Sequence, residues 1–347
     1  SEAKQVNIIR QGKPVTLNLP GDLDMESFYT MKHCLINAFI LLSISIMTTS
    51  CSPKVEMIPA ELAYQAEATT GEGSIWHPER HTLFWVDIEG QTLYEYHPDT
   101  KECSSWKFDR MVSTVVPETD STVIIALQDE IVRVNLHDGH TTSIAPIPDE
   151  NGKVRCNDGK CDPAGHLWVG TMGFGAPKGA GTLYTVSPAG TVTTKLKKVT
   201  ISNGIVWSSN KKFMYYNDTP TGKIARYRYD ADNGDILFDG IAVTLPGGTG
   251  VPDGMAIDSD DHLWVAQWGG YGVYCYNPYT GELLAKVEVP APNVASCAFG
   301  GKKMDTLYIT TARAGLSEEQ LREYPLSGSV FCCKPGVKGI RANCFGE

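Results

Sequence analysis

From about residue 66 to its end, the chain alternates between short apolar runs and clusters of turn-forming residues. Residues 81–87 (His-Thr-Leu-Phe-Trp-Val-Asp) lead through a Glu-Gly pair into residues 91–96 (Gln-Thr-Leu-Tyr-Glu-Tyr), and His-Pro-Asp follows. β-Branched and aromatic residues dominate these runs, and no 3.6-residue period passes through them. The pattern predicts an all-β fold of short strands joined by turns.

The same strand–turn–strand unit returns along the chain. The clear copies occupy residues 81–96, 166–186, 213–230 and 262–278, and two weaker copies occupy roughly 112–136 and 294–333. A strand-rich repeat of about 40–50 residues is typical of propeller blades. The six copies predict a six-bladed β-propeller over residues 66–347, with four strands in each blade. A sandwich or barrel of equal length is the alternative, and residues 317–323 form the only helix-like stretch.

Four short segments each combine an oxygen donor with a nearby glycine and lead into strand-like runs. The donors are Glu72 in segment 71–76, Asn157 in 155–159, Asn203 in 202–207 and Asp253 in 251–255. The last three recur at intervals of 46 and 50 residues. Because equivalent positions in successive blades face one axis, we expect the four side chains to converge in the central channel with a metal ion between them.

Two carboxylates and amide oxygens form an oxygen-only donor set, which suits Ca²⁺, Mg²⁺ or Mn²⁺ better than a soft metal. We expect one divalent cation, with Ca²⁺ favoured and Mg²⁺, Mn²⁺ and Zn²⁺ as alternatives. Each segment also has a plain structural interpretation. Glu72 could bind a backbone N–H, and Asp253 could be a turn residue. The Asn-Gly segment at 203–204 and the Asn-Asp-Gly segment at 157–159 could be turns with φ > 0.

Composition narrows the class of protein. The chain has 347 residues, 42% of them hydrophobic and 20% charged, as in ordinary globular proteins. Its net charge of −10 and the absence of a basic run argue against a nucleic-acid partner. None of its ten cysteines forms a Cys-x-x-Cys pair, so a thiolate zinc site is not expected. Most of them are interpreted as small core residues, and the sequence does not give any disulfide pairing.

The first 55 residues differ from the rest. Met31-Lys32-His33 precedes an apolar run, which ends in small residues before Cys51. This is the pattern of an export signal, so we expect residues 31–51 to be a lipoprotein signal peptide with Cys51 lipidated. The alternative is a buried or uncleaved apolar segment, since Thr48 replaces the usual leucine. Residues 1–30 are interpreted as an upstream extension or an added segment, and residues 52–65 as a linker.

The donor segments, in this order, resemble the family of regucalcin (senescence marker protein 30), gluconolactonase and luciferin-regenerating enzyme. The resemblance covers residues 70–346. It includes Gly-Glu-Gly-x-x-Trp at 71–76, Asn-Asp-Gly-Lys-x-Asp-Pro-x-Gly at 157–165, Gly-Thr-Met at 170–172, Ser-Asn-Gly at 202–204, Pro-Asp-Gly-Met at 252–255 and Phe-Gly-Gly at 299–301. It implies a six-bladed propeller with one divalent cation in the channel and, for many members, hydrolysis of sugar lactones.

The resemblance also implies roles for single residues. Glu72, Asn203 and Asp253 match direct metal ligands, and Asn157 matches a residue that contacts the metal, often through water, and the substrate. Arg155 matches an arginine that binds substrate hydroxyls or carboxylate, although a solvated or ion-paired arginine is the alternative. From the residues themselves, Asp218 lies where a blade strand ends near the channel, and we expect it either to support the donors from behind or to lie at the rim of the substrate site. The repeating Trp168, Trp207 and Trp264 are interpreted as core rather than as a substrate platform.

The implied chemistry is lactone hydrolysis. The metal would polarise the carbonyl of the ring ester, and water would attack it with Asp253 as the base, Glu72 being the competing choice. After Gly-Thr-Met, residues 173–177 (Gly-Phe-Gly-Ala-Pro) replace a stretch in which vertebrate relatives carry a substrate-contacting glutamate. Gluconolactone as the substrate is therefore left open.

Two rival functions remain at this point. One is a non-catalytic propeller that binds a carbohydrate or a protein and holds a structural metal. The other is an aryl-ester or organophosphate hydrolase that uses the same site. For the lactonase we expect a small sugar lactone as partner, no nucleic acid, and a monomer or weak dimer. We expect an exported bacterial protein, in the periplasm or attached to the membrane only through its lipid.

Overall fold

The fold is taken from a computed structural model, which describes residues 4–10, 13–19, 54–149 and 152–347. The chain divides into two compact units, Ser1–Lys54 and Val55–Glu347. In the first unit, β1 (Lys4–Arg10) and β2 (Lys13–Leu19) form an antiparallel hairpin. The predicted signal peptide 31–51 lies outside the described residues. Across the described ranges, no helix has the length and apolar character needed to cross a membrane.

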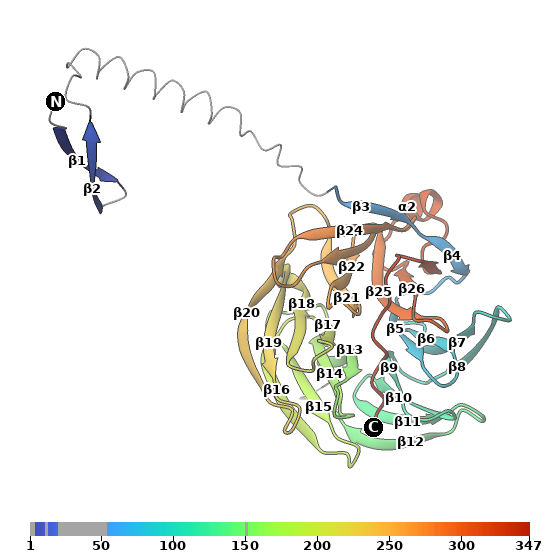
Figure 1. Ribbon diagram of the computed structural model, residues 1–347. Coiled ribbons are helices and arrows are strands. Elements are labelled where there is room, and N and C mark those ends of the chain that lie inside the picture. Colours follow the sequence, from blue (N-terminus) through green and yellow to red (C-terminus); the bar gives the residue numbers. More distant parts are fainter. Residues whose placement is uncertain (1–3, 11–12, 20–53, 150–151) are drawn as a thin grey trace. The chain divides into compact units, whose positions relative to one another are not determined.

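Four blades of the second unit are separate antiparallel sheets of four strands each (Figure 1). From the innermost strand outward, they are β5 (Gly71–His77), β6 (Thr82–Asp87), β7 (Thr92–His97) and β8 (Glu102–Lys107); β9 (Val112–Pro117), β10 (Thr122–Leu127), β11 (Glu130–Asn135) and β12 (Thr141–Pro146); β13 (Val154–Cys161), β14 (Leu167–Gly173), β15 (Gly181–Val186) and β16 (Val192–Val199); and β17 (Ser202–Trp207), β18 (Phe213–Asp218), β19 (Lys223–Tyr229) and β20 (Ile236–Thr244). A short 3₁₀ helix, η1 (Thr219–Thr221), follows β18.

The other strands of this unit form one nine-stranded sheet. They are β3 (Glu56–Pro59), β4 (Glu61–Tyr64), β21 (Val251–Ile257), β22 (Leu263–Trp268), β23 (Gly272–Tyr276), β24 (Leu283–Glu288), β25 (Asn293–Gly300), β26 (Thr306–Ala312) and β27 (Val330–Cys333). The predicted all-β propeller is confirmed, but the six separate blades are not. Four sheets are separate. The remaining nine strands form one continuous sheet, because β22 pairs with β25 at Trp268 and Asn293.

The predicted linker 52–65 was wrong over most of its length. Within it, β3 pairs in parallel with β24, and β4 pairs antiparallel with β27. The physical reason is that outer strands leave a row of backbone N–H and C=O groups unpaired, and β3 and β4 satisfy those of two such edges. The propeller unit therefore begins at Val55 rather than at residue 66.

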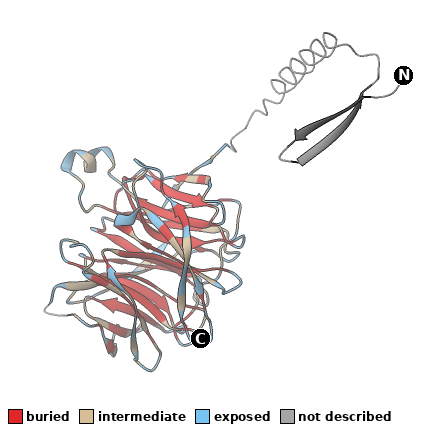
Figure 2. Ribbon diagram, turned by 90° about the vertical axis from the view of Figure 1, so that its left-hand side faces the viewer, coloured by how far each residue is buried: buried red, intermediate tan, exposed pale blue. Residues whose placement is uncertain are grey.

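The innermost strands surround the channel. Their contacts run in a closed cycle from β5 through β9, β13, β17, β21 and β25 back to β5. They are almost wholly buried, in keeping with the red strands at the centre of the ring in Figure 2. The outer strands β8 and β16 consist mostly of exposed and half-buried residues. Trp168, Trp207 and Trp264 are buried between the sheets, which confirms their interpretation as core. Six of the eight described cysteines are buried too, and all eight are free thiols.

The C-terminal segment crosses one end of the channel (Figure 1, dark red). Its backbone bonds to residues at or just after the ends of three inner strands, namely Pro117, Gly165 and Ile257. Together with the ends of β5, β13, β17, β21 and β25, residues 340–343 line a cavity of about 80 Å³. None of the four predicted oxygen donors lines this cavity, because they lie near the starts of the inner strands.

The helical stretch predicted at 317–323 is confirmed as α2 (Glu318–Glu323). Ser317 is its N-cap, and the Ser317 side chain and Gln320 form a reciprocal capping box. None of its residues is buried, so it contributes little to the core.

Candidate functional site

Every inner strand that carries a predicted donor has a β-bulge in its first half. The pairing register shifts between Glu72 and Ile75, Cys156 and Gly159, Asn203 and Ile205, and Pro252 and Met255. A bulge sets two residues of one strand opposite one residue of its partner, and it changes the direction of the side chains there. The repeated bulge therefore explains how donors on four different strands can turn toward one point.

The glycines beside the donors are required mainly for close packing. Gly73 has a positive φ of 59°, but Gly159, Gly204 and Gly254 do not. A Cβ added at Gly204 would lie 2.4 Å from Asn217 Nδ2 and 2.6 Å from the Asp253 carbonyl oxygen. The interpretation of the Asn-Asp-Gly and Asn-Gly segments as turns with φ > 0 was therefore wrong for Gly159 and Gly204. Gly204 and Gly254 let neighbouring inner strands approach each other, and Gly159 lets β13 approach β14.

The structure brings the four predicted donors together, each about 5% exposed. Asn157 Nδ2 donates to Asn203 Oδ1 at 3.0 Å and to the Ser202 carbonyl at 2.8 Å. The carboxyl groups of Glu72 and Asp253 lie close enough for each to shift the other's pKa. Side chains that are up to 181 residues apart in the chain thus form one buried cluster.

Neighbouring side chains fix this cluster from behind. Asn203 Nδ2 donates to Thr219 Oγ1 at 2.7 Å, and Thr219 Oγ1 in turn donates to the Pro252 carbonyl at 2.9 Å. Asn217 Nδ2 donates to the Asp253 carbonyl at 2.8 Å. The sequence did not single out Asn217 or Thr219 as supports of the site. The only signal in the sequence was their position at or just after the end of the strand that follows a donor strand.

Asp158 is a third carboxylate in the cluster that the sequence did not single out. It is buried, and its charge acts on both Glu72 and Asp253. Its Oδ1 accepts a bond from the Gly159 N–H at 2.8 Å. Its place beside Asn157 in an Asn-Asp-Gly segment was a usable signal, but the sequence does not show which of two adjacent residues faces the channel.

Two oxygens of the cluster have no hydrogen-bond partner. Within the part of the chain that the structure describes, Asp253 Oδ1 and Asp158 Oδ2 are buried and accept no bond. A buried carboxylate oxygen without a donor is costly unless a cation neutralises it. The carboxyl groups of Glu72 and Asp253, the second with an unsatisfied buried oxygen, together with the two neighbouring amides therefore fit a hard divalent cation.

The same crowding shifts the titration of the carboxyl groups. Burial, followed by the nearby charges of Asp253 and Asp158, raises the pKa of Glu72 well above its usual range. Burial likewise raises the pKa of Asp253 to about 8, against the opposing effect of the Glu72 hydrogen bond. Burial also raises the pKa of Asp158, and the positive charge of Lys160 opposes it. Without a cation, the cluster therefore holds protons near neutral pH.

Arg155 lies beside the cluster, as expected. Its Nη1 donates to Asn157 Oδ1 at 2.8 Å and to the Cys156 carbonyl at 2.9 Å. Burial lowers the pKa of the guanidinium, and the carboxylates of Glu89 and Glu72 oppose that shift. The arginine thus places a positive charge next to the amide that the sequence assigned to both metal and substrate.

Asp218 contacts the backbone that precedes a donor strand. Its two oxygens accept bonds from the backbone N–H groups of Thr200 at 3.0 Å and Ile201 at 2.8 Å. Asp87 does the same for the segment before β5. Asp218 therefore holds the backbone that leads into β17, and these contacts give no support to substrate binding. An aspartate at a strand end looks the same in sequence whichever role it has.

A second group of possible metal ligands consists of Asp258, His262 and Cys275, whose ligand atoms lie within 4.8 Å of one another. Asp258 Oδ2 accepts a hydrogen bond from Trp264 Nε1–H at 2.9 Å, and His262 Nδ1 lies 3.4 Å from the same Oδ2. The blade of β13–β16 repeats this arrangement with Asp162, Trp168 and His166, but Thr185 takes the position of Cys275. We therefore interpret the group as a recurring brace for the turn between two strands.

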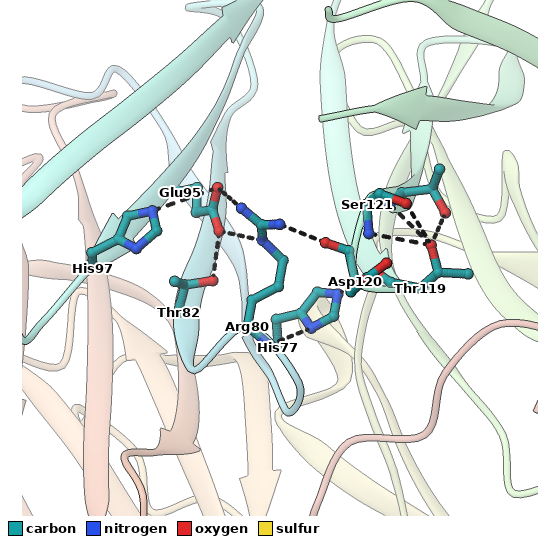
Figure 3. A network of polar contacts seen from close by, with 9 residues as sticks. His77, Arg80, Thr82, Glu95, His97, Thr119, Asp120 and Ser121 are labelled. Carbon is teal, nitrogen blue, oxygen red and sulfur yellow. Dashed lines mark hydrogen bonds and ion pairs between the residues drawn. The ribbon is translucent and has the colours of Figure 1, made fainter. Parts of the chain in front are cut away.

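A charged network lies at the other end of β5 from Glu72 (Figure 3). The Glu95 side chain, 2% exposed, accepts bonds from Arg80 at 2.6 and 3.1 Å and from Thr82 Oγ1 at 2.8 Å. Arg80 Nη1 also donates to the Asp120 carbonyl at 2.5 Å, which ties the first blade to the second. Because the buried carboxylate is paired, this network braces two blades.

Fold and site together define a β-propeller with a buried site of carboxylates and amides at one end of its channel. The chain belongs to the SMP-30/Gluconolactonase/LRE-like family, whose model matches residues 70–313. The resemblance seen in the sequence is thereby confirmed.

Individual relatives agree with this assignment. The Bacillus subtilis protein YvrE, which carries a sugar lactone lactonase name, is 36% identical over 282 residues, covering 81% of this chain and 97% of YvrE. Regucalcin of Danio rerio is 33% identical over 286 residues, or 82% of this chain and 97% of its own length. The crystal structure of a calcium-binding protein, regucalcin from Agrobacterium tumefaciens, matches with a TM-score of 0.79 and 28% identity, covering 84% of this chain and 99% of that one.

Proposed function

We propose that this chain hydrolyses a sugar lactone with the help of one divalent cation. Glu72, Asn203 and Asp253 would hold the cation, and Asn157 would lie beside it. The observation that carries the proposal is the buried Asp253 Oδ1, which has no partner among the described residues although it lies in a cluster of carboxylates and amides. Membership of a family with lactonase-named relatives supports the reaction class.

Calcium is the favoured cation, because every donor in the cluster is an oxygen and the related Agrobacterium tumefaciens regucalcin is described as calcium-binding. A bound divalent cation would withdraw charge from the carbonyl oxygen of the ester. Mg²⁺, Mn²⁺ and Zn²⁺ are the alternatives that a metal titration would rank.

The residues of the chain divide the remaining tasks. Arg155, fixed by its bonds to Asn157 and the Cys156 carbonyl, would donate to a hydroxyl or carboxylate group of the substrate. The Asp253 carboxylate would accept the proton of the attacking water, and Glu72, which lies next to it, is the competing base. The buried setting limits the access of bulk water to the reacting ester.

We further propose that the nine-stranded sheet represents two blades, which makes the propeller six-bladed. Strands β21–β24, and strands β25–β27 together with β4, each repeat the order of the separate blades. The two halves are joined by the single pair Trp268 and Asn293. The closed cycle of six inner strands supports this division.

The test is a panel of lactones assayed with chelator-treated and calcium-restored protein. We expect hydrolysis to stop on chelation, to return with Ca²⁺, and to be lost in Asp253→Asn. The matched control is Asp232→Asn, an exposed aspartate, which should keep wild-type rates. Tight ligand binding without turnover in any form would favour a binding propeller instead. Hydrolysis of phenyl esters in preference to lactones would favour an aryl-ester hydrolase.

We also propose that the protein is exported and lipid-anchored through Cys51, which lies outside the described residues. Radiolabelled palmitate fed to a bacterial host should label the wild type and not Cys51→Ser. Equal labelling of the two would contradict the anchor.

A further inference from the structure

Phe174 lies on the same face of its sheet as Arg155. Arg155 pairs directly with Met172, and the ladder continues where the Phe174 N–H donates to the Lys153 carbonyl at 3.0 Å. Paired residues of antiparallel strands share a face, and so do residues two apart along a strand. Met172 and Phe174 therefore stand on the face from which Arg155 reaches Asn157.

The loop after Phe174 has a defined shape. Gly175 and Ala176 both have positive φ, at 75° and 53°, and the Ala176 N–H donates to the Gly173 carbonyl at 2.9 Å. Gly179 N–H donates to Thr200 Oγ1 at 3.1 Å, which ties the loop to the segment that leads into the strand of Asn203. Phe174 itself is 44% exposed. The loop thus holds an aromatic ring at the mouth of the site.

A second apolar pair lies at the mouth, near Asp253. Val251 precedes Asp253 by two residues and pairs directly with Trp268 on β22. Val251 is 38% exposed, and Trp268 is half-buried. The next pair, Pro252 with the buried Gln267, falls on the opposite face. Val251 and Trp268 therefore flank the approach to the carboxylates from a different blade than Phe174 does.

We propose that Phe174, with Val251 and Trp268, forms the apolar entrance of the site and selects lactones whose ring carries an alkyl or aryl substituent. This inference rests on the proposed lactonase function and names its substrate class more closely. A ring hydroxyl placed against these side chains would lose hydrogen bonds to water without replacement, whereas an apolar substituent gains by leaving water. Arg155 remains available for a polar group at the other side of the ring.

The test compares two lactones of equal ring size, δ-decanolactone, which carries a pentyl group, and glucono-δ-lactone. We expect the calcium-loaded wild type to have the higher kcat/KM for δ-decanolactone. Phe174→Ala should reduce that preference about tenfold, mainly through KM, as a lost apolar contact does. The matched control is Phe238→Ala, because Phe238 is the same residue type and at least as exposed, at 57% against 44%, but lies on the outer strand β20.

A binding measurement separates this inference from the proposed function. The six-membered lactam with the same pentyl group is not hydrolysed, so its Kd reports the entrance alone. We expect Phe174→Ala to weaken lactam binding about tenfold and Phe238→Ala to leave it unchanged.

The outcomes divide cleanly. Lactam binding that depends on Phe174, without turnover of either lactone, would keep the apolar entrance and refute the lactonase. Two outcomes would overturn the entrance and keep the lactonase. One is turnover in which the wild type prefers glucono-δ-lactone. The other is turnover in which Phe174→Ala changes neither the substrate preference nor the lactam Kd. Neither turnover nor lactam binding would refute both.

Discussion

Replacing Asp253 with asparagine should change the pH dependence of stability in the metal-free protein. In the folded chain, burial raises the pKa of Asp253 from 3.8 to about 8. A carboxyl group with a raised folded pKa binds more protons in the folded state than in the unfolded state. Its contribution to stability is therefore complete below about pH 3.8, falls as the pH rises, and levels off above about pH 8. Asparagine does not titrate, so the variant loses this dependence.

The size of the effect follows from the shift. One pKa unit corresponds to about 1.36 kcal/mol, so the free energy of unfolding should fall by up to roughly 1.4 kcal/mol for each pH unit. At pH 7, about three units above the ordinary value, the accumulated penalty is roughly 4 kcal/mol. Since domains are stable by about 5–15 kcal/mol, this term should be measurable.

The assay is urea denaturation in the presence of a chelator at pH 5, 6.5 and 8. We expect the variant to become more stable than the wild type as the pH rises, while the exposed-site control Asp232→Asn follows the wild type. Added Ca²⁺ should narrow the difference, because a ligand at 100 times its Kd stabilises the wild type by about 2.7 kcal/mol, which is less than the roughly 4 kcal/mol penalty at pH 7, and the variant binds the ion more weakly. Parallel pH profiles for wild type and Asp253→Asn would refute the placement of a protonated carboxyl in the cluster.

Three further predictions follow from the geometry. Gly204→Ala should lower both calcium affinity and Tm, because its Cβ would lie 2.6 Å from the Asp253 carbonyl oxygen. The control is Gly247→Ala, whose Cβ would meet nothing within 4 Å. Equal calcium affinities for the two variants in calorimetric titrations would contradict the close approach of the strands at Gly204. A chain that begins at residue 66 should melt several degrees below one that begins at Val55, because it leaves two sheet edges unpaired; coincident melting curves would contradict that role for β3 and β4. Cys275→Ser should bind as much Zn²⁺ as the wild type in a titration, and a loss of one equivalent would show that the turn brace is a metal site.

Much of the site followed from local signals. The repeat spacing located the blades, and the donor–glycine segments located Glu72, Asn157, Asn203 and Asp253, because a propeller places equivalent strand starts around one axis. The tryptophans were recognised as core for the same reason, since they recur at one position in the repeat. These features depend on period and residue type, which a sequence displays directly.

Other features were out of reach. The sequence could not show that both carboxylate oxygens of Asp218 bind backbone N–H groups, or that Asp158 lies beside Glu72 and Asp253. Both contacts depend on the direction of a side chain at a strand end or a bulge. The pairing of β3 and β4 was missed because these four-residue strands are mostly exposed and show no clear alternation.

The sequence by itself determined the kind of fold, the chemical character of the site and the strands that contribute to it. Only the tertiary structure decided how closely the inner strands approach, and that closeness determines the rest. It explains why glycines follow the donors, why three carboxyl groups share one buried space, and why their protons are held near neutral pH. The physical reason is that strand propensity and repeat period act along the chain, whereas burial and charge repulsion arise between strands that meet only when the ring closes.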